Sequence, residues 1–219
     1  MTSAAFILQP IFSTFRIMAY TSCVTEVAAN IAMDCNHPQV GGYTGRAVLI
    51  PYSANPTLTQ DTENPRIIKG IAIQEGKNVI MVDNVMQAPF DGSNKASTAE
   101  NGRPTFVKTF AFRVPLRGAV ASKDVIEPLL SSSQGFLCVA EKKDKAGHGS
   151  FEVIGALQPL TTNGDGISQN ENENDGDVTV TMSCTEAWYE AELFVTGASG
   201  KSDYAASKEA FEDLIKKAF

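Results

Sequence analysis

The stretch "DVTVTMSC", residues 177–184, decides the fold class of this chain. Apolar residues alternate along it with hydroxyl residues: Val178, Val180, Met182 and Cys184 would face one way, and Thr179, Thr181 and Ser183 the other. A period of two is the period of a β-strand, whose successive side chains point to opposite faces of a sheet. The stretch therefore predicts a strand in a sheet that has one buried face and one wet face.

Further strand patterns lie along the rest of the chain. The clearest is "TFVKTFAFRVPL", residues 105–116, where one face would hold a row of aromatic and aliphatic residues and one charged exception: Phe106, Lys108, Phe110, Phe112 and Val114. The other strand-like segments are residues 46–52, 67–74, 78–84, 136–143, 150–157 and 187–195. This pattern predicts a mainly β protein, an antiparallel β-sandwich or barrel.

Two turn signals predict hairpins within this set. Glu75 and Gly76 separate residues 67–74 from residues 78–84, so we expect these two strands to pair. The first of them would place alternate residues on one side: Ile67, Lys69, Ile71 and Ile73. A basic, glycine-bearing turn joins residues 136–143 to residues 150–157 and predicts the second hairpin.

Two helices complete the expected elements. Residues 121–133 begin with Ser122 as an N-cap and Asp124 in the first turn, and Pro128 keeps this flanking helix short. Its apolar stripe would consist of Val125, Leu129 and Leu130. A stronger helix ends the chain, with apolar residues at helical spacing: Tyr204, Phe211, Leu214, Ile215 and Ala218. We expect this C-terminal helix to dock on the protein's own sheet.

The remaining segments are polar or peripheral. Residues 1–17 form a peripheral N-terminal segment interrupted by Pro10, and Met18 is an alternative translation start. Residues 18–219 would then form a single β-rich domain. Three long polar segments punctuate this domain, and the long loop at 84–104 is expected to have no regular structure of its own; the segments are residues 53–66, 84–104 and 161–176.

Composition limits the function classes. The chain has 219 residues, 43% of them hydrophobic, and a net charge of −7 with a pI of about 4.9. A core of ordinary size is therefore possible, whereas an acidic chain is poorly suited to holding nucleic acid, because phosphate binding rests on Lys and Arg. No apolar stretch approaches the ~18 residues that a membrane-spanning helix needs, so no membrane partner is expected.

The sequence offers no local signature of chemistry. The two histidines, His37 and His148, lie in turn-like stretches, and Cys138 and Cys184 fall inside strand patterns as small buried hydrophobes. An EF-hand reading of the acidic loop would use Glu171, Glu173 and Asp175, but its terminal glutamate would fall on Met182 inside a strand. We therefore expect no enzyme and assign no catalytic, cofactor-binding or metal residue.

The order of elements between Lys108 and Val195 resembles that of the tail tube proteins of long-tailed bacteriophages, most closely over residues 136–185. In that family a short helix precedes a hairpin of the 136–157 kind, and an acidic loop and a threonine-rich strand follow. The resemblance implies a virion structural protein whose rings, usually of six subunits, close an inner β-barrel and stack into a tube. It further implies assembly in the host cytoplasm, contacts with other tail proteins, and passage of DNA through an acidic lumen without specific binding.

Two other classes remain open from the sequence. One is a related virion or contractile-injection part, such as a head–tail connector or a capsid decoration protein. The other is a ligand-binding β-sandwich, for example a carbohydrate module, which usually displays an exposed aromatic platform. The chain has a single tryptophan, Trp188, and a half-buried strand position suits it better than a platform.

Overall fold

The computed structural model describes residues 42–83, 91–98, 104–115, 124, 127–143, 150–162, 167–169, 177–186, 192–194 and 204–218. All of them belong to one compact unit, Gln39–Phe219. The predicted peripheral segment, residues 1–17, lies outside the described residues. Within the described part, no helix is long and apolar enough to cross a membrane.

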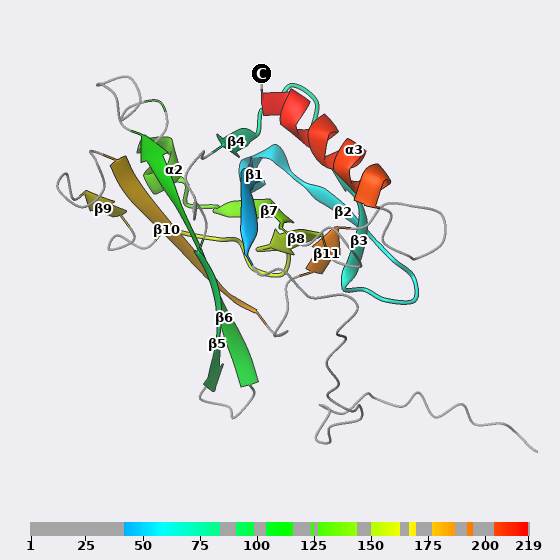
Figure 1. Ribbon diagram of the computed structural model, residues 1–219, viewed down its shortest axis with the longest axis horizontal. Helices are drawn as coiled ribbons and strands as arrows, with labels where there is room; N and C mark the ends of the chain where they lie inside the picture. The colour runs from blue at the N-terminus through cyan, green and yellow to red at the C-terminus, as the bar shows by residue number, and fades with distance from the viewer. Residues whose placement is uncertain are drawn as a thin grey trace, which may run out of the picture. The chain divides into compact units, whose positions relative to one another are not determined.

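The described chain is mainly β and forms two sheets (Figure 1). The larger has seven strands in the order β2-β3-β11-β8-β7-β1-β4, and the smaller has four in the order β5-β6-β10-β9. The strands of the larger sheet are β1 (Tyr43–Pro51), β2 (Thr57–Gln60), β3 (Ile67–Ala72), β4 (Ile80–Asp83), β7 (Phe136–Lys142), β8 (Phe151–Ile154) and β11 (Glu192–Phe194). Those of the smaller are β5 (Asp91–Thr98), β6 (Pro104–Pro115), β9 (Ile167–Gln169) and β10 (Asp177–Glu186). All pairs are antiparallel except β3 with β11.

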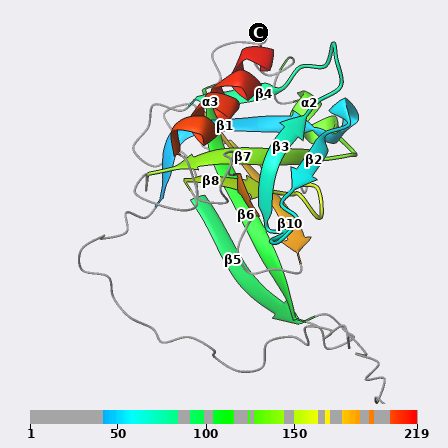
Figure 2. The ribbon, with the colours of Figure 1, turned by 90° about the vertical axis from the view of Figure 1, so that its right-hand side faces the viewer.

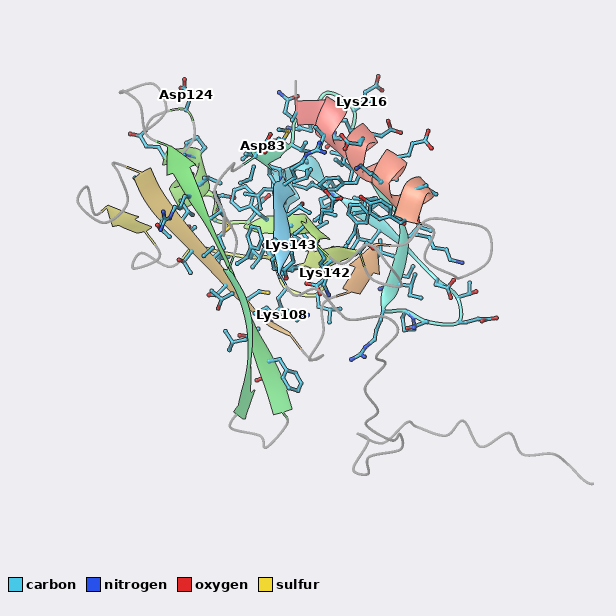
Figure 3. The ribbon with its side chains drawn as sticks, in the orientation of Figure 1. Asp83, Lys108, Asp124, Lys142, Lys143 and Lys216 are labelled. Atoms are coloured by element: carbon cyan, nitrogen blue, oxygen red, sulfur yellow. The ribbon has the colours of Figure 1, made fainter. Side chains whose placement is uncertain are left out.

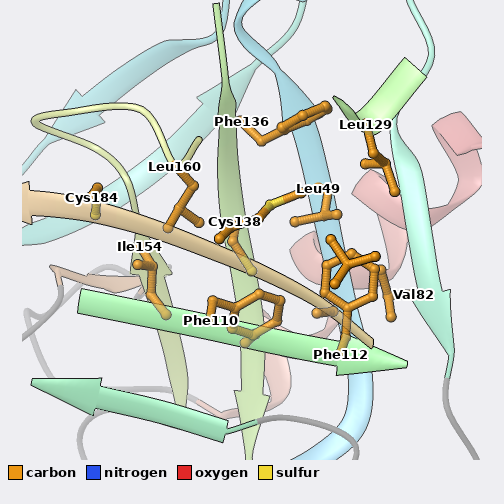
Figure 4. Packing of buried hydrophobic residues seen from close by; sticks show 14 of the residues in the cluster. Leu49, Val82, Phe110, Phe112, Leu129, Phe136, Cys138, Ile154, Leu160 and Cys184 are labelled. Carbon is orange, nitrogen blue, oxygen red and sulfur yellow. The ribbon is translucent and has the colours of Figure 1, made fainter. Parts of the chain in front are cut away.

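The two sheets pack face to face over a single apolar core (Figure 4). The larger sheet contributes alternate residues of β1 and β7, such as Leu49 and Cys138, and the smaller sheet contributes Phe110 of β6 and Met182 of β10. These four residues have no exposed surface. The architecture is a β-sandwich, as the alternating strands predicted.

The C-terminal helix α3 (Tyr204–Ile215), continued by η3 (Lys216–Ala218), covers the other face of the larger sheet (Figures 1 and 2). Phe211 is fully buried against Phe151 of β8, with ring centroids 5.1 Å apart. Arg46 of β1 donates to both carboxylate oxygens of Glu212, at 2.6 and 2.8 Å. The predicted docking of this helix on the sheet is confirmed, and its apolar stripe is the one expected from the sequence.

Several predicted strands are confirmed with small changes at their ends. In β10 the apolar positions are buried and the hydroxyl positions 179, 181 and 183 are not. The inner row of β6 is likewise buried at Phe110, Phe112 and the charged exception, Lys108. The β7–β8 hairpin forms, with Cys138 opposite Ile154.

The predicted pairing of residues 67–74 with residues 78–84 is wrong. A turn does form, since the Lys77 N–H donates to the Gln74 carbonyl at 3.2 Å and Gly76 has a φ of +76°. The strands on its two sides nevertheless part: β3 pairs with β2 and β11, whereas β4 pairs with β1. A local turn fixes the path of the chain but not the partner that a strand finds in the sheet.

The alternation expected along β3 is also only partly right. Ile68 has no exposed surface, whereas Ile67 and Lys69 are half-buried. Gln60 of β2 is opposite Ile68, and Thr59 is opposite Gly70, so β3 carries one extra residue at this point. Such a bulge changes which residues face the core, and it breaks the strict alternation assumed from the sequence.

Three strands lie in segments that were expected to be long polar loops. They are β2 within residues 53–66, β5 within residues 84–104 and β9 within residues 161–176. The expectation that residues 84–104 lack regular structure is therefore wrong, because β5 pairs with β6 along its whole length. Each of the three is an edge strand with a polar sequence.

Of the first predicted helix, residues 121–133, the structure describes Asp124 and residues 127–133, and the helix ends at Ser131. The structure places α2 at Glu127–Ser131, with Pro128 in its first turn, where the missing N–H of proline is tolerated. Leu129 of the predicted stripe is buried in the core between the sheets. Val125 lies outside the described residues, and so does the side chain of Leu130. A single-turn helix, η1 (Tyr52–Ala54), follows β1.

A candidate assembly surface on the four-stranded sheet

The outward face of the four-stranded sheet is polar and rich in hydroxyl groups. On β10 the side chains of Thr179, Thr181 and Ser183 are half-buried, and Thr185 is exposed. The antiparallel register sets these residues opposite the outward row of β6, so that the face is built from the pairs Arg113–Thr179, Ala111–Thr181, Thr109–Ser183 and Val107–Thr185. Among these eight described side chains, Arg113 is charged and the others are neutral.

This face differs from its counterpart on the larger sheet. There, α3 buries Phe211, Leu214 and Ile215 against the strands. Neither of the two apolar clusters found in the described part of the chain includes an outward residue of β6 or β10. The polar face is thus a surface of the described part of the chain, whereas the opposite side of the sandwich is covered by a helix.

Two edge strands, each open on its outer side within the described part of the chain, border the polar face (Figure 1). On one side, β5 pairs with β6 from Asp91–Ala111 to Thr98–Pro104. On the other side, β9 pairs with β10 over three residues. A strand with a sheet neighbour on one side only presents a row of backbone N–H and C=O groups on the other, and this row can pair with another chain.

The register shows which groups of β5 point outward. Ser183 exchanges two backbone hydrogen bonds with Thr161, at 3.0 and 3.1 Å, so its N–H and C=O groups point away from β6. The backbone N–H and C=O of Thr109, which is opposite Ser183, therefore point toward β5. Those of Ser93, which is opposite Thr109, point back toward β6. Because the direction alternates along a strand, the N–H and C=O of Ala96 point to the open edge.

A partly buried polar network fixes the end of the larger sheet where β1, β7 and β8 meet. Tyr43 donates to one oxygen of Glu152 at 2.5 Å. Lys142, which lies at this end of the sheet (Figure 3), donates to the other at 2.7 Å. Burial raises the pKa of the Tyr43 phenol well above its ordinary value, and the Glu152 carboxylate raises it further. The phenol therefore stays protonated and serves as a fixed hydrogen-bond donor.

Another carboxylate, which is buried, lies on the helix side of the same sheet. Glu141 is 3% exposed, and its carboxylate accepts hydrogen bonds from Tyr204 of α3 at 2.8 Å and from Thr44 at 3.2 Å. These contacts tie the start of α3 to β1 and β7. Both networks hold strands and helix in position, and their hydrogen-bonding groups are engaged with one another rather than aimed at a ligand.

Two surface cavities lie near the four-stranded sheet and the α2 helix. One, of about 440 Å³, is lined by Gln158, Pro159, Thr161, Ser183, Cys184 and Thr185. The other, of about 370 Å³, lies between β4, α2 and the start of β7 and is lined by proline, serine, glutamine, isoleucine and phenylalanine. The described residues that line these cavities include no acid–base pair of the kind that general acid–base catalysis requires.

The residues weighed as possible ligands fall mostly outside the described set, namely His37, His148, Glu171, Glu173 and Asp175. Met182, which would occupy the terminal position of the calcium loop, is fully buried in β10. Within the described residues, no group of three or more His, Cys, Asp or Glu side chains could hold a metal ion.

The cysteines within strands behave as small hydrophobes. Cys138 and Cys184 are both buried, and neither forms a disulfide. Burial raises the pKa of the Cys138 thiol well above its ordinary value, and the nearby Glu152 carboxylate adds to this shift. A thiol held protonated in this way is a poor nucleophile. Trp188, the possible platform residue, lies outside the described residues.

Scans of the chain against family models, curated proteins and solved structures each returned no match. The description of the fold and of the polar face therefore rests on the geometry of this chain.

Proposed function

We propose that the chain is a tail tube subunit of a long-tailed bacteriophage, a virion structural protein whose rings stack around a passage for DNA. The observation that supports this proposal is the hydroxyl-rich face of the four-stranded sheet, bordered by the open edges of β5 and β9. A sandwich that seals one side with α3 and leaves a polar sheet face on the other is suited to line an aqueous channel.

Ring closure would use the two open edges. The β5 edge of one subunit would pair with the β9 edge of the next, so that the four-stranded sheets join into a continuous barrel. This contact is heterologous, because the two surfaces that meet are different, and it closes when the rotation between subunits completes a circle. Pairing would satisfy the outward backbone groups of β5, including those of Ala96.

The polar face would then line the lumen. Thr179, Thr181 and Ser183 offer hydroxyl groups that exchange hydrogen bonds with water and hold no net charge. Retention of DNA depends on Lys and Arg that neutralise phosphates, and each such contact makes binding weaken with salt. Among the described side chains of the face, Arg113 is the one cation, and it stands beside a row of uncharged hydroxyl groups. The chain's excess of acidic residues, 25 against 18 basic ones, would further disfavour adhesion of DNA to the tube.

A charge placed on the polar face tests this assignment. Thr181→Lys adds a cation to the proposed lumen, and Thr57→Lys adds the same charge to an exposed position of β2 on the other sheet. Both variants should fold, because neither residue lies in the core. Assembled Thr181→Lys should retain duplex DNA in a manner that weakens as salt rises, whereas assembled Thr57→Lys should behave as the unmodified chain. Equal DNA retention by the two variants would remove the lumen assignment.

The edge contact is tested separately. Ala96→Pro removes an N–H that points to the open edge and leaves the β5–β6 ladder bonds in place. The loss of a hydrogen bond worth about 1 kcal/mol at each contact should raise the concentration needed for assembly by at least about fivefold. Ala96→Ser keeps the N–H and is the matched control. If Ala96→Pro assembled as readily as Ala96→Ser, the β5 edge would not be the contact.

A further inference from the structure

No further inference is drawn: the strongest candidate, the cavity beside β10 lined by Gln158, Pro159, Thr161, Ser183, Cys184 and Thr185 and adjoining the exposed Leu157, carries nothing because nothing in the structure shows what covers it.

Discussion

Replacement of Phe211 by alanine tests whether α3 is an integral layer of the sandwich. The side chain is fully buried, packs on Phe151 at a centroid distance of 5.1 Å, and lies 5.9 Å beneath the guanidinium of Arg46. The change would leave a cavity between the helix and the larger sheet, because strands β1, β7 and β8 cannot collapse into it without breaking their ladders.

The expected cost follows from the burial. A fully buried phenylalanine replaced by alanine loses about 3–5 kcal/mol of stability through lost transfer free energy and the residual cavity. That is a large part of the ~5–15 kcal/mol that stabilises an ordinary domain. For a chain of this size, where 1 kcal/mol corresponds to roughly 2–4 °C, the Tm should fall by roughly 6–20 °C.

Chemical denaturation followed by circular dichroism measures the effect, with Lys216→Ala as a control on the same helix. Lys216 pairs with Asp213 at 2.7 Å, but both side chains are largely exposed, at 75% and 60%. Removal of such a pair should change stability by less than about 1 kcal/mol. A loss below about 1 kcal/mol for Phe211→Ala, equal to that of the control, would refute the docking of α3.

Two further predictions concern a glycine and a carboxylate. Gly135 has a φ of +73°, and a Cβ there would lie 2.5 Å from the Leu160 carbonyl oxygen, so Gly135→Ala should destabilise the fold clearly more than Gly76→Ala, where φ is +76° but the space is open. Comparable unfolding midpoints for the two variants would contradict the close approach. The pKa of Asp61 is lowered to about 2 by its bond to Lys69 and by backbone N–H groups, so its contribution to stability is present above the ordinary pKa of 3.8 and is lost as pH falls from about 4 to about 2. Asp61→Asn should flatten that part of the stability–pH curve, and an unchanged slope would show that the carboxylate is not held in this way.

The elements that the sequence predicts well are those in which burial alone sets the pattern. In β10, Val178, Val180 and Met182 reach the core because side chains two apart point the same way. In α3, Phe211 and Leu214 do so because residues three and four apart share a helix face. Each pattern is complete within one segment, so no knowledge of its partner is needed.

The polar edge strands β5 and β9 could not be predicted in this way. The sequence of β5, "DGSNKAST", contains no large apolar residue, and β9 reads "ISQ". An edge strand is held by a backbone ladder to one neighbour, and its side chains need not enter the core. The pairing partner, β6 for β5 and β10 for β9, is visible only once the sheet is assembled.

Pairing between distant segments is the other part that the sequence could not supply. The β4 strand joins β1, where Leu49 is opposite Ile80, rather than β3 across its own turn. For the candidate surface, the alternation predicted a wet hydroxyl row on β10. It could not predict that β6 would place Thr109 and Ala111 beside this row, or which face of the sandwich α3 would cover.

Electron microscopy of the purified full chain over a concentration series tests whether the chain builds a tube. We expect rings that stack into hollow tubes above a threshold concentration, with the polar face of β6 and β10 toward the lumen. Ala96→Pro should raise that threshold, and Ala96→Ser should leave it unchanged. A chain that remains monomeric at the highest concentrations, alone and with cognate virion proteins, would contradict the tube and favour a ligand-binding sandwich.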